Sequence, residues 1–141
     1  MIKLDDEIRN NVATAIDNLK TMTAAYVDVN GRPHISFYGS THVHSDDELA
    51  LWVRNPEGSL LKTLPDNPHI AFIYGDIANK TYYTFDGRGR VETDEAIRER
   101  VYQEMHPIER KFDENKGGVA VIVALDKVAV LTAAGKRVME R

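Results

Sequence analysis

Apolar and polar residues alternate along the chain with two periods, one typical of helices and one typical of strands. The helical period predicts amphipathic helices over 4–20 and 94–105. The remaining apolar segments have the composition and spacing of strands, with Asn30-Gly31 as a hairpin signal. The segments predicted as strands are 22–29, 34–44 with a bend at Gly39-Ser40, 49–53, 70–74, 81–92, 119–125 and 128–132.

The stretch 47–76 is the most informative part of this pattern. It holds two continuous apolar runs, 49–53 and 70–74, which are typical of strands buried on both faces. The polar connector between them predicts a short helix that begins at Ser59, with the Ser59 hydroxyl as its cap. The amides at the start of this helix are a candidate anion site, although the stretch alone favours a connector that binds nothing.

The order of the predicted elements favours a small antiparallel barrel packed by helices. Two glycines, Gly87 and Gly89, lie in the long segment 81–92, as expected for a strongly curved barrel strand. A chain of 141 residues is long enough for one domain with a substantial core, and no linker or repeat divides it.

Composition removes several classes of function. The net charge is −4 and the basic residues are scattered, so nucleic acid is not an expected partner. No apolar run is long enough to span a membrane and the first residues are too acidic for a signal peptide, so a cytoplasmic location is expected. The chain has no cysteine, which excludes disulfides, thiol nucleophiles and thiolate metal sites.

Three segments, in this order and spacing, resemble the pyridoxamine 5'-phosphate oxidase-like FMN-binding split-barrel family. Segment 27–34 resembles the family's hairpin with an acidic residue, a glycine and a proline. Segment 64–71 resembles its Asn-Pro start of a strand, and 85–91 resembles its glycine-containing strand before a helix. The resemblance implies a mainly β, α+β fold, a six- to seven-stranded antiparallel split barrel with flanking helices, as a single domain over 1–141.

Members of that family commonly form homodimers and bind FMN at the subunit interface, so the resemblance implies a flavin site. A Ser-any-Lys pattern before the Asn-Pro proline typically holds the phosphate, but this chain has Gly58 and Leu60 at those positions. The resemblance therefore points to neighbouring cations and hydroxyls for the phosphate, and to polar groups of the preceding strands for the flavin ring. The candidate cofactor-binding residues are Ser36, Tyr38, Ser40, Thr41, Arg54, Ser59 and Lys62.

Two aromatic residues and one loop have alternative interpretations. Trp52 and Tyr74 are candidates to wall the flavin ring, although the apolar run around Trp52 favours a place in the core. The charged loop 106–118 either covers the cofactor, with Arg110 or Lys111 reaching a ligand, or is a solvated connector.

The expected function is that of a flavin-dependent oxidoreductase that transfers hydride between a nicotinamide or other reductant and a small organic substrate. The expected cofactor is FMN, with a deazaflavin as the alternative. Hydride transfer at a flavin requires positioning and exclusion of water, so no catalytic residue is assigned. One alternative is a non-catalytic split-barrel binding protein without the flavin site. Another is a metal protein that uses His42 and His44, which share a strand face, or a haem protein with any one of the five histidines as the ligand.

Overall fold

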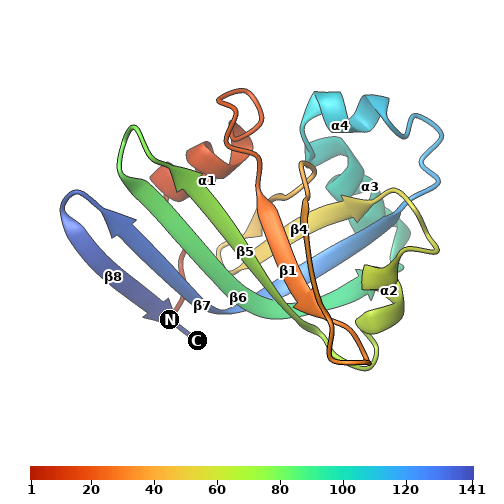
Figure 1. Ribbon diagram of the computed structural model, residues 1–141. Helices are drawn as coiled ribbons and strands as arrows, with labels where there is room; N and C mark the ends of the chain where they lie inside the picture. Colours follow the sequence, from red (N-terminus) through yellow and green to blue (C-terminus); the bar gives the residue numbers. More distant parts are fainter.

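The computed structural model describes residues 1–141 and contains four helices and eight strands (Figure 1). The strands are all antiparallel and lie in the order β2-β1-β5-β6-β7-β4-β3, with β8 paired to β7. They are β1 Thr23–Val27, β2 Pro33–Phe37, β3 His42–Ser45, β4 Glu48–Val53, β5 His69–Asp76, β6 Thr81–Glu92, β7 Val119–Thr132 and β8 Gly135–Glu140. The helices are α1 Asp6–Ala13, α2 Ser59–Thr63, α3 Glu95–Glu104 and α4 Pro107–Lys111. No pairing joins β2 to β3, so the strongly curved sheet is a split barrel, as predicted.

The curvature of the sheet depends on the long strand β6, which pairs with both β5 and β7. The register with β7 shifts between Asp86 and Gly87, which is the signature of a bulge. A Cβ at Gly87 would lie 2.5 Å from the Ala124 carbonyl oxygen and 2.7 Å from the Val123 side chain. Glycine is therefore required for this close approach of the two strands, which confirms the interpretation of 81–92 as a curved strand.

Alternate residues of the strands point into one apolar core, which α1 covers with Ile8 and Val12. A second, smaller cluster lies beneath α3, where Trp52 packs edge-on against Tyr102 with ring centroids 5.1 Å apart. Figure 1 shows α3 and α4 together at the end of the sheet where β4 ends and β7 begins. This end of the barrel therefore has a helical cover, whereas Ile35 and Phe37 of β2 and Ile73 of β5 are exposed.

The structure corrects five local expectations. The segments 119–125 and 128–132 were expected to be two strands, yet they form the single strand β7, because the chain bulges at Asp126 instead of turning there. The segment 135–140 was not expected to be a strand, yet it forms β8 against the second half of β7. The first helix ends at Ala13 rather than continuing to residue 20, because turns follow it and Leu19 has a φ of 59°. Ala15 is nevertheless buried, whereas Leu19 is 88% exposed, so the predicted apolar face does not extend to the end of these turns. The charged loop after α3 contains α4, whose cap is His106, and α2 is capped by Gly58 rather than by Ser59.

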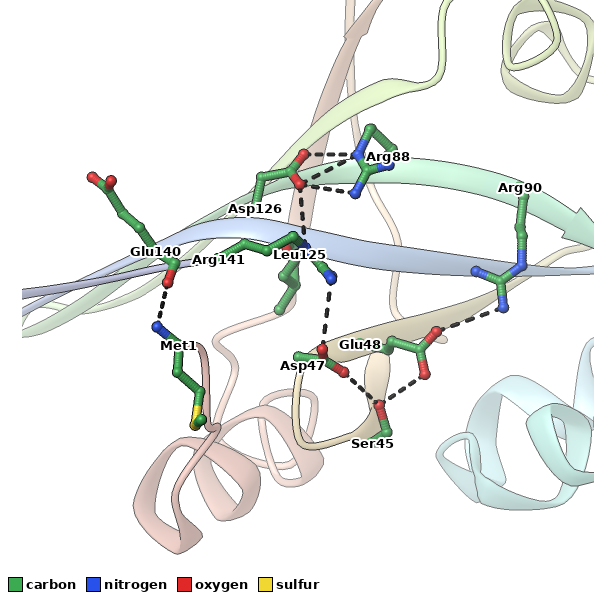
Figure 2. Close-up of polar contacts among 10 residues, drawn as sticks. All are labelled: Met1, Ser45, Asp47, Glu48, Arg88, Arg90, Leu125, Asp126, Glu140 and Arg141. Atoms are coloured by element: carbon green, nitrogen blue, oxygen red, sulfur yellow. Dashed lines mark hydrogen bonds and ion pairs between the residues drawn. The ribbon is translucent and has the colours of Figure 1, made fainter.

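Ion pairs join the β3–β4 hairpin to the middle of the sheet (Figure 2). Arg88 binds Asp126 at 2.9 Å, and Arg90 reaches Glu48 on β4 at 3.5 Å. Arg141 lies between Asp126 and Asp47, at 3.6 and 3.7 Å. Most of these side chains are partly exposed, so each pair contributes little free energy of unfolding. None of the four helices has the length and apolar composition needed to cross a bilayer.

Candidate functional site

A cavity of about 500 Å³ lies between the end of β2, the end of β4 and α4; we call it the β2–β4 cavity. Four of the seven predicted cofactor-binding residues line it, namely Ser36, Tyr38, Ser40 and Arg54. The Ser40 hydroxyl bonds to both the carbonyl and the amide of Trp52, which holds the β2–β3 connection beside the end of β4, so residues far apart in sequence meet here. The structure therefore brings together most of the site that the resemblance implied.

Arg54 supplies the positive charge of this cavity. Its guanidinium carbon lies 4.8 Å from the centre of the Phe112 ring, a cation–π contact that holds the side chain next to α4. No ion pair to a carboxylate engages Arg54, although the carboxylate of Glu109 lines the same cavity. An exposed arginine without a carboxylate partner is available to bind an anion.

Tyr38 and Ser40 differ in what their hydroxyl groups can do. Tyr38 is half-buried, and burial together with Tyr26 raises the pKa of its phenol, so the hydroxyl remains a hydrogen-bond donor at neutral pH. Ser40 is buried, and its hydroxyl donates to the Trp52 carbonyl at 3.0 Å and accepts from the Trp52 amide at 2.9 Å. Ser40 thus joins the β2–β3 connection to β4, and its hydroxyl is already engaged.

The other three predicted residues lie outside this cavity. Ser59 and Lys62 are exposed on α2. They line neither the β2–β4 cavity nor a second cavity, described below, beside the end of α1. Leu60, at the position where a lysine is common, is only 2% exposed and belongs to the main core. Thr41 lines a neighbouring cavity. The resemblance thus named segments that lie close together, without fixing which way each side chain points.

Trp52 and Tyr74 are core residues rather than free walls for a ring. Tyr74 stacks on Tyr83 inside the barrel, with ring centroids 5.1 Å apart. Trp52 is buried beneath α3, although it also borders the β2–β4 cavity. Its indole Nε1 donates to the Asp113 carboxylate at 2.8 Å. The core alternative for Trp52 is therefore confirmed.

The loop after α3 is held in place by polar groups and not by apolar side chains. Ile108 and Phe112 are exposed, whereas Tyr102 donates its hydroxyl to the Asp113 carbonyl at 3.0 Å. The Arg110 guanidinium donates to two main-chain carbonyls, those of Gln103 and Met105. Arg110 therefore fixes the corner between α3 and α4 instead of reaching toward a ligand.

His42 and His44 share one face of β3, as predicted, and both are buried. Burial lowers the pKa of both imidazoles, and the nearby Arg100 guanidinium lowers that of His44 further. Nδ1 of His42 lies 2.8 Å from the Ser40 carbonyl oxygen, while Nε2 of His42 has no hydrogen-bond partner. No group of three potential ligands in the structure could hold a metal ion.

A second cavity of about 540 Å³ lies between the end of α1, the β2–β3 connection and the corner between α3 and α4; we call it the α1–α3 cavity. It contains Thr41 and His42 and shares Gly39 and Ile16 with the β2–β4 cavity. The sequence did not indicate this cavity, because nothing in the pattern predicts that the segments around residues 15 and 105 meet.

Comparison with known proteins identifies the fold and the family. A family model described as pyridoxamine 5'-phosphate oxidase matches residues 8–131. The structure of HupZ from Group A Streptococcus has a TM-score of 0.71 at 19% identity, covering 97% of this chain and 99% of that one. A protein from Clostridium acetobutylicum related to general stress protein 26 of Bacillus subtilis has a TM-score of 0.68 at 12% identity, with 96% of both chains covered.

A heme-binding protein from Mycobacterium smegmatis is also similar in structure, with a TM-score of 0.66 at 12% identity. The similarity covers 92% of this chain and 57% of that chain. At these identities the structural likeness establishes a shared fold and nothing finer. Curated protein sequences gave no significant match to the chain.

Proposed function

The chain belongs to the pyridoxamine 5'-phosphate oxidase family, and on this premise we propose that it is a flavin-dependent oxidoreductase with FMN in the β2–β4 cavity. The observation that carries the proposal is the position of Arg54, an arginine without a carboxylate partner at a cavity lined by polar groups of β2. A planar guanidinium can bind two phosphate oxygens at once, so Arg54 would replace the lysine that is absent at Leu60.

The residues of the cavity fit a flavin in their chemistry. Arg54 would bind the phosphate, and the protonated Tyr38 hydroxyl and the Ser36 hydroxyl would donate to the polar edge of the ring. Because the Ser40 hydroxyl is engaged with Trp52, Ser40 would position the cavity wall rather than bind the cofactor directly. Ser59 and Lys62 lie outside the cavity of one protomer, so a role for them requires a second subunit or a movement of α2.

FMN, when bound, supplies the hydride-accepting and hydride-donating chemistry between a reductant such as a nicotinamide and a small organic substrate. The protein would contribute binding, orientation and exclusion of water. The apolar side chains around the cavity, including Phe37 and Ile108, would limit access of water to the ring. A deazaflavin fits the same description, and a cytoplasmic location is part of the proposal.

We further propose that the protein is a homodimer through the outer face of β1, β2 and β5. Phe37, Thr23 and Ile73 lie side by side across these strands, with Ile35 in the next row. Ile35 and Phe37 are 75% and 74% exposed and Ile73 is 48% exposed, so a continuous apolar surface lies open on a single chain. Such surfaces are typical of protein interfaces, and this one borders the β2–β4 cavity through Phe37.

Titration of the purified protein with FMN, followed by flavin fluorescence or a visible spectrum, tests the proposal. We expect saturable binding, with affinity at least about tenfold lower in Arg54→Ala because a charged hydrogen bond is lost. Lys3→Ala removes an exposed cation outside the cavity and serves as the matched control. Lys62→Ala tests whether α2 takes part. If neither FMN nor a deazaflavin binds at tens of micromolar, the flavin function is wrong.

Measurements on the same protein samples distinguish two other functions from the flavin function. A stable dimer that binds no flavin would support a binding protein of the same fold without redox activity. The histidines suggest the other alternative, since His42 has a neutral imidazole with a free Nε2 and one structural neighbour is named as a heme-binding protein. Addition of hemin would then give a Soret band that is lost in the variant His42→Asn.

A further inference from the structure

The β2–β4 cavity contains two charged side chains of opposite sign that do not pair with each other. They are Arg54, directly after β4, and Glu109, in the first turn of α4. No other charged side chain lines the cavity, and Glu109 has neither an ion pair nor a hydrogen bond to its carboxylate. Because Arg54 is assigned to the cofactor phosphate, the carboxylate of Glu109 is left to face the rest of the cavity.

The carboxylate of Glu109 is held against the β2–β3 connection. A Cβ on Gly39 would lie 3.0 Å from Oε2 of Glu109 and 3.1 Å from its carboxyl carbon, so the carboxylate packs closely on this glycine. Cδ1 of Ile16 lies 3.1 Å from the same point. Glu109 is half-buried, and a carboxylate beside a glycine and a methyl group attracts a cation more strongly than one in open solvent does.

The hydrogen-bond donors nearest to Glu109 in sequence are engaged elsewhere. The guanidinium of Arg110 donates to two main-chain carbonyls at the corner between α3 and α4. The amide of Ile108 donates to Nδ1 of His106 at 3.1 Å, which caps the helix. Glu109 therefore neither caps α4 nor neutralises a basic neighbour, and its charge is available to a ligand.

We propose that Glu109 determines which hydride donor the β2–β4 cavity accepts, by stabilising the positive charge that develops on a nitrogen-containing donor of the dihydropyridine class. This inference rests on the proposed flavin function. The C–H bond of the donor breaks and both of its electrons leave with the hydrogen for the oxidised flavin, so the flavin is reduced and the donor ring becomes a pyridinium cation. A fixed carboxylate beside that ring stabilises the charge as it forms.

The same carboxylate works against donors of the opposite charge. A 2-hydroxy acid keeps its negative charge when it loses hydride, so Glu109 repels it before and after the transfer. With Arg54 on the cofactor phosphate, no cation of the lining remains to bind such an acid. The pair of opposite charges thus favours a phosphate at one side of the cavity and a cationic ring at the other.

The probes 1-methylnicotinamide and nicotinamide test this charge preference, because they have nearly the same shape and differ by one positive charge. Each is titrated into the isotope-labelled chain loaded with FMN, and the amides of Gly39 and Glu109 are followed by NMR. We expect the cation to bind about fivefold more tightly at low salt, with a ratio that falls as salt is added. Equal affinities, or shifts that leave Gly39 and Glu109 unaffected, would overturn the proposal.

Variants of the carboxylate test its part in this preference. Glu109→Gln removes the charge with little change of shape and should bring the ratio of the two affinities to about one. Glu109→Asp keeps the charge and should retain part of the preference. Glu114→Gln is the matched control, because it makes the same change at an exposed position outside the cavity and should leave the ratio unchanged. A full preference in Glu109→Gln would refute the assignment.

A structural role for Glu109 predicts a different result. If the carboxylate served only the N-terminus of α4, Glu109→Gln would lower the melting temperature and leave the ratio unchanged, which would overturn the proposal. Should Glu109→Gln not fold, the ratio and its salt dependence in the natural chain decide the matter. FMN binding with equal affinities for the two probes would remove this inference alone, whereas a natural chain that binds no flavin would remove the proposed function as well.

Discussion

The Trp52 indole donates to the Asp113 carboxylate at 2.8 Å, which joins the buried end of β4 to the loop that follows α4. The same carboxylate accepts from the amides of Gly117 and Gly118, at 3.0 and 2.8 Å. Burial raises the pKa of Asp113, but these three hydrogen bonds outweigh it and the pKa is lowered. One ionised side chain thus fixes the loop beside the β2–β4 cavity.

Replacement of this carboxylate should destabilise the protein. Asp113→Ala leaves the Trp52 indole and two amides without their acceptor, and we expect the free energy of unfolding to fall by about 2–3 kcal/mol. Urea denaturation measures this change. Glu114→Ala, at the adjacent exposed position, should alter stability by less than about 0.5 kcal/mol. Equal stability of the two variants would show that the loop is held by other contacts.

Gly118 is required by the same arrangement. A Cβ at this position would lie 2.4 Å from the Trp52 indole nitrogen and 2.7 Å from the Val53 carbonyl oxygen. Gly118→Ala must therefore displace β4 or the loop, and we expect a loss of about 2 kcal/mol or more in thermal or urea unfolding. Gly117→Ala is the control, because its nearest neighbour would be at 3.8 Å. A stable Gly118→Ala protein would contradict this packing.

The buried imidazoles predict a loss of stability in mild acid. The pKa values of His42 and His44 are lowered below the ordinary 6.5, so the unfolded chain binds more protons than the folded one as pH falls through that range. The contribution of these two imidazoles to the free energy of unfolding is fully present above about pH 6.5 and should decrease below it. Glu104 and Glu48 oppose this effect, while Arg100 and Arg90 add to it at His44.

Melting temperatures between about pH 7.5 and 5.5 measure this dependence. The double variant in which Asn replaces His42 and His44 should lose less stability over the same interval than the natural chain. An identical slope in both proteins would mean that other groups control the response to acid.

The proposed dimer predicts the effect of a charge on the outer sheet face. Phe37→Asp would place a carboxylate in the centre of the apolar surface, and we expect it to give a monomer in light scattering after size exclusion. Ile77→Asp changes a residue that is 79% exposed in the β5–β6 turn, away from this surface, and should leave the mass unchanged. A natural chain that is monomeric at micromolar concentration would contradict the dimer.

The sequence predicted the strands well because their apolar period reports directly on burial. The two continuous apolar runs 49–53 and 70–74 are found as the mostly buried parts of β4 and β5, and 81–92 is the strand β6. The sequence did not predict β8, because that strand is short, basic and mostly exposed and therefore lacks the alternation of apolar and polar residues that marks a half-buried strand. The helix α4 was missed although His106-Pro107 is a recognisable start, with the imidazole capping the helix.

The site was harder to predict than the fold. The segments that form the β2–β4 cavity follow from the order of strands, but the direction of single side chains does not. Ser40 turns its hydroxyl to Trp52, and Lys62 lies outside the cavity, because the packing of Leu60 sets the rotation of α2. The pairing of Thr41 and His42 with α1 and α3 depends on tertiary contacts that no local pattern contains.

The burial of Leu60 limits how this protein could acquire the lysine contact that the family resemblance implies. A lysine at position 60 would bring an ammonium group into the main core, where an unpaired charge is strongly unfavourable. Successive residues of a helix are separated by a rotation of about 100°, so a change in the length of the 54–58 segment would turn a different face of α2 toward the cavity. An engineered lysine contact would therefore be better introduced by an insertion or deletion before α2 than by the point substitution Leu60→Lys.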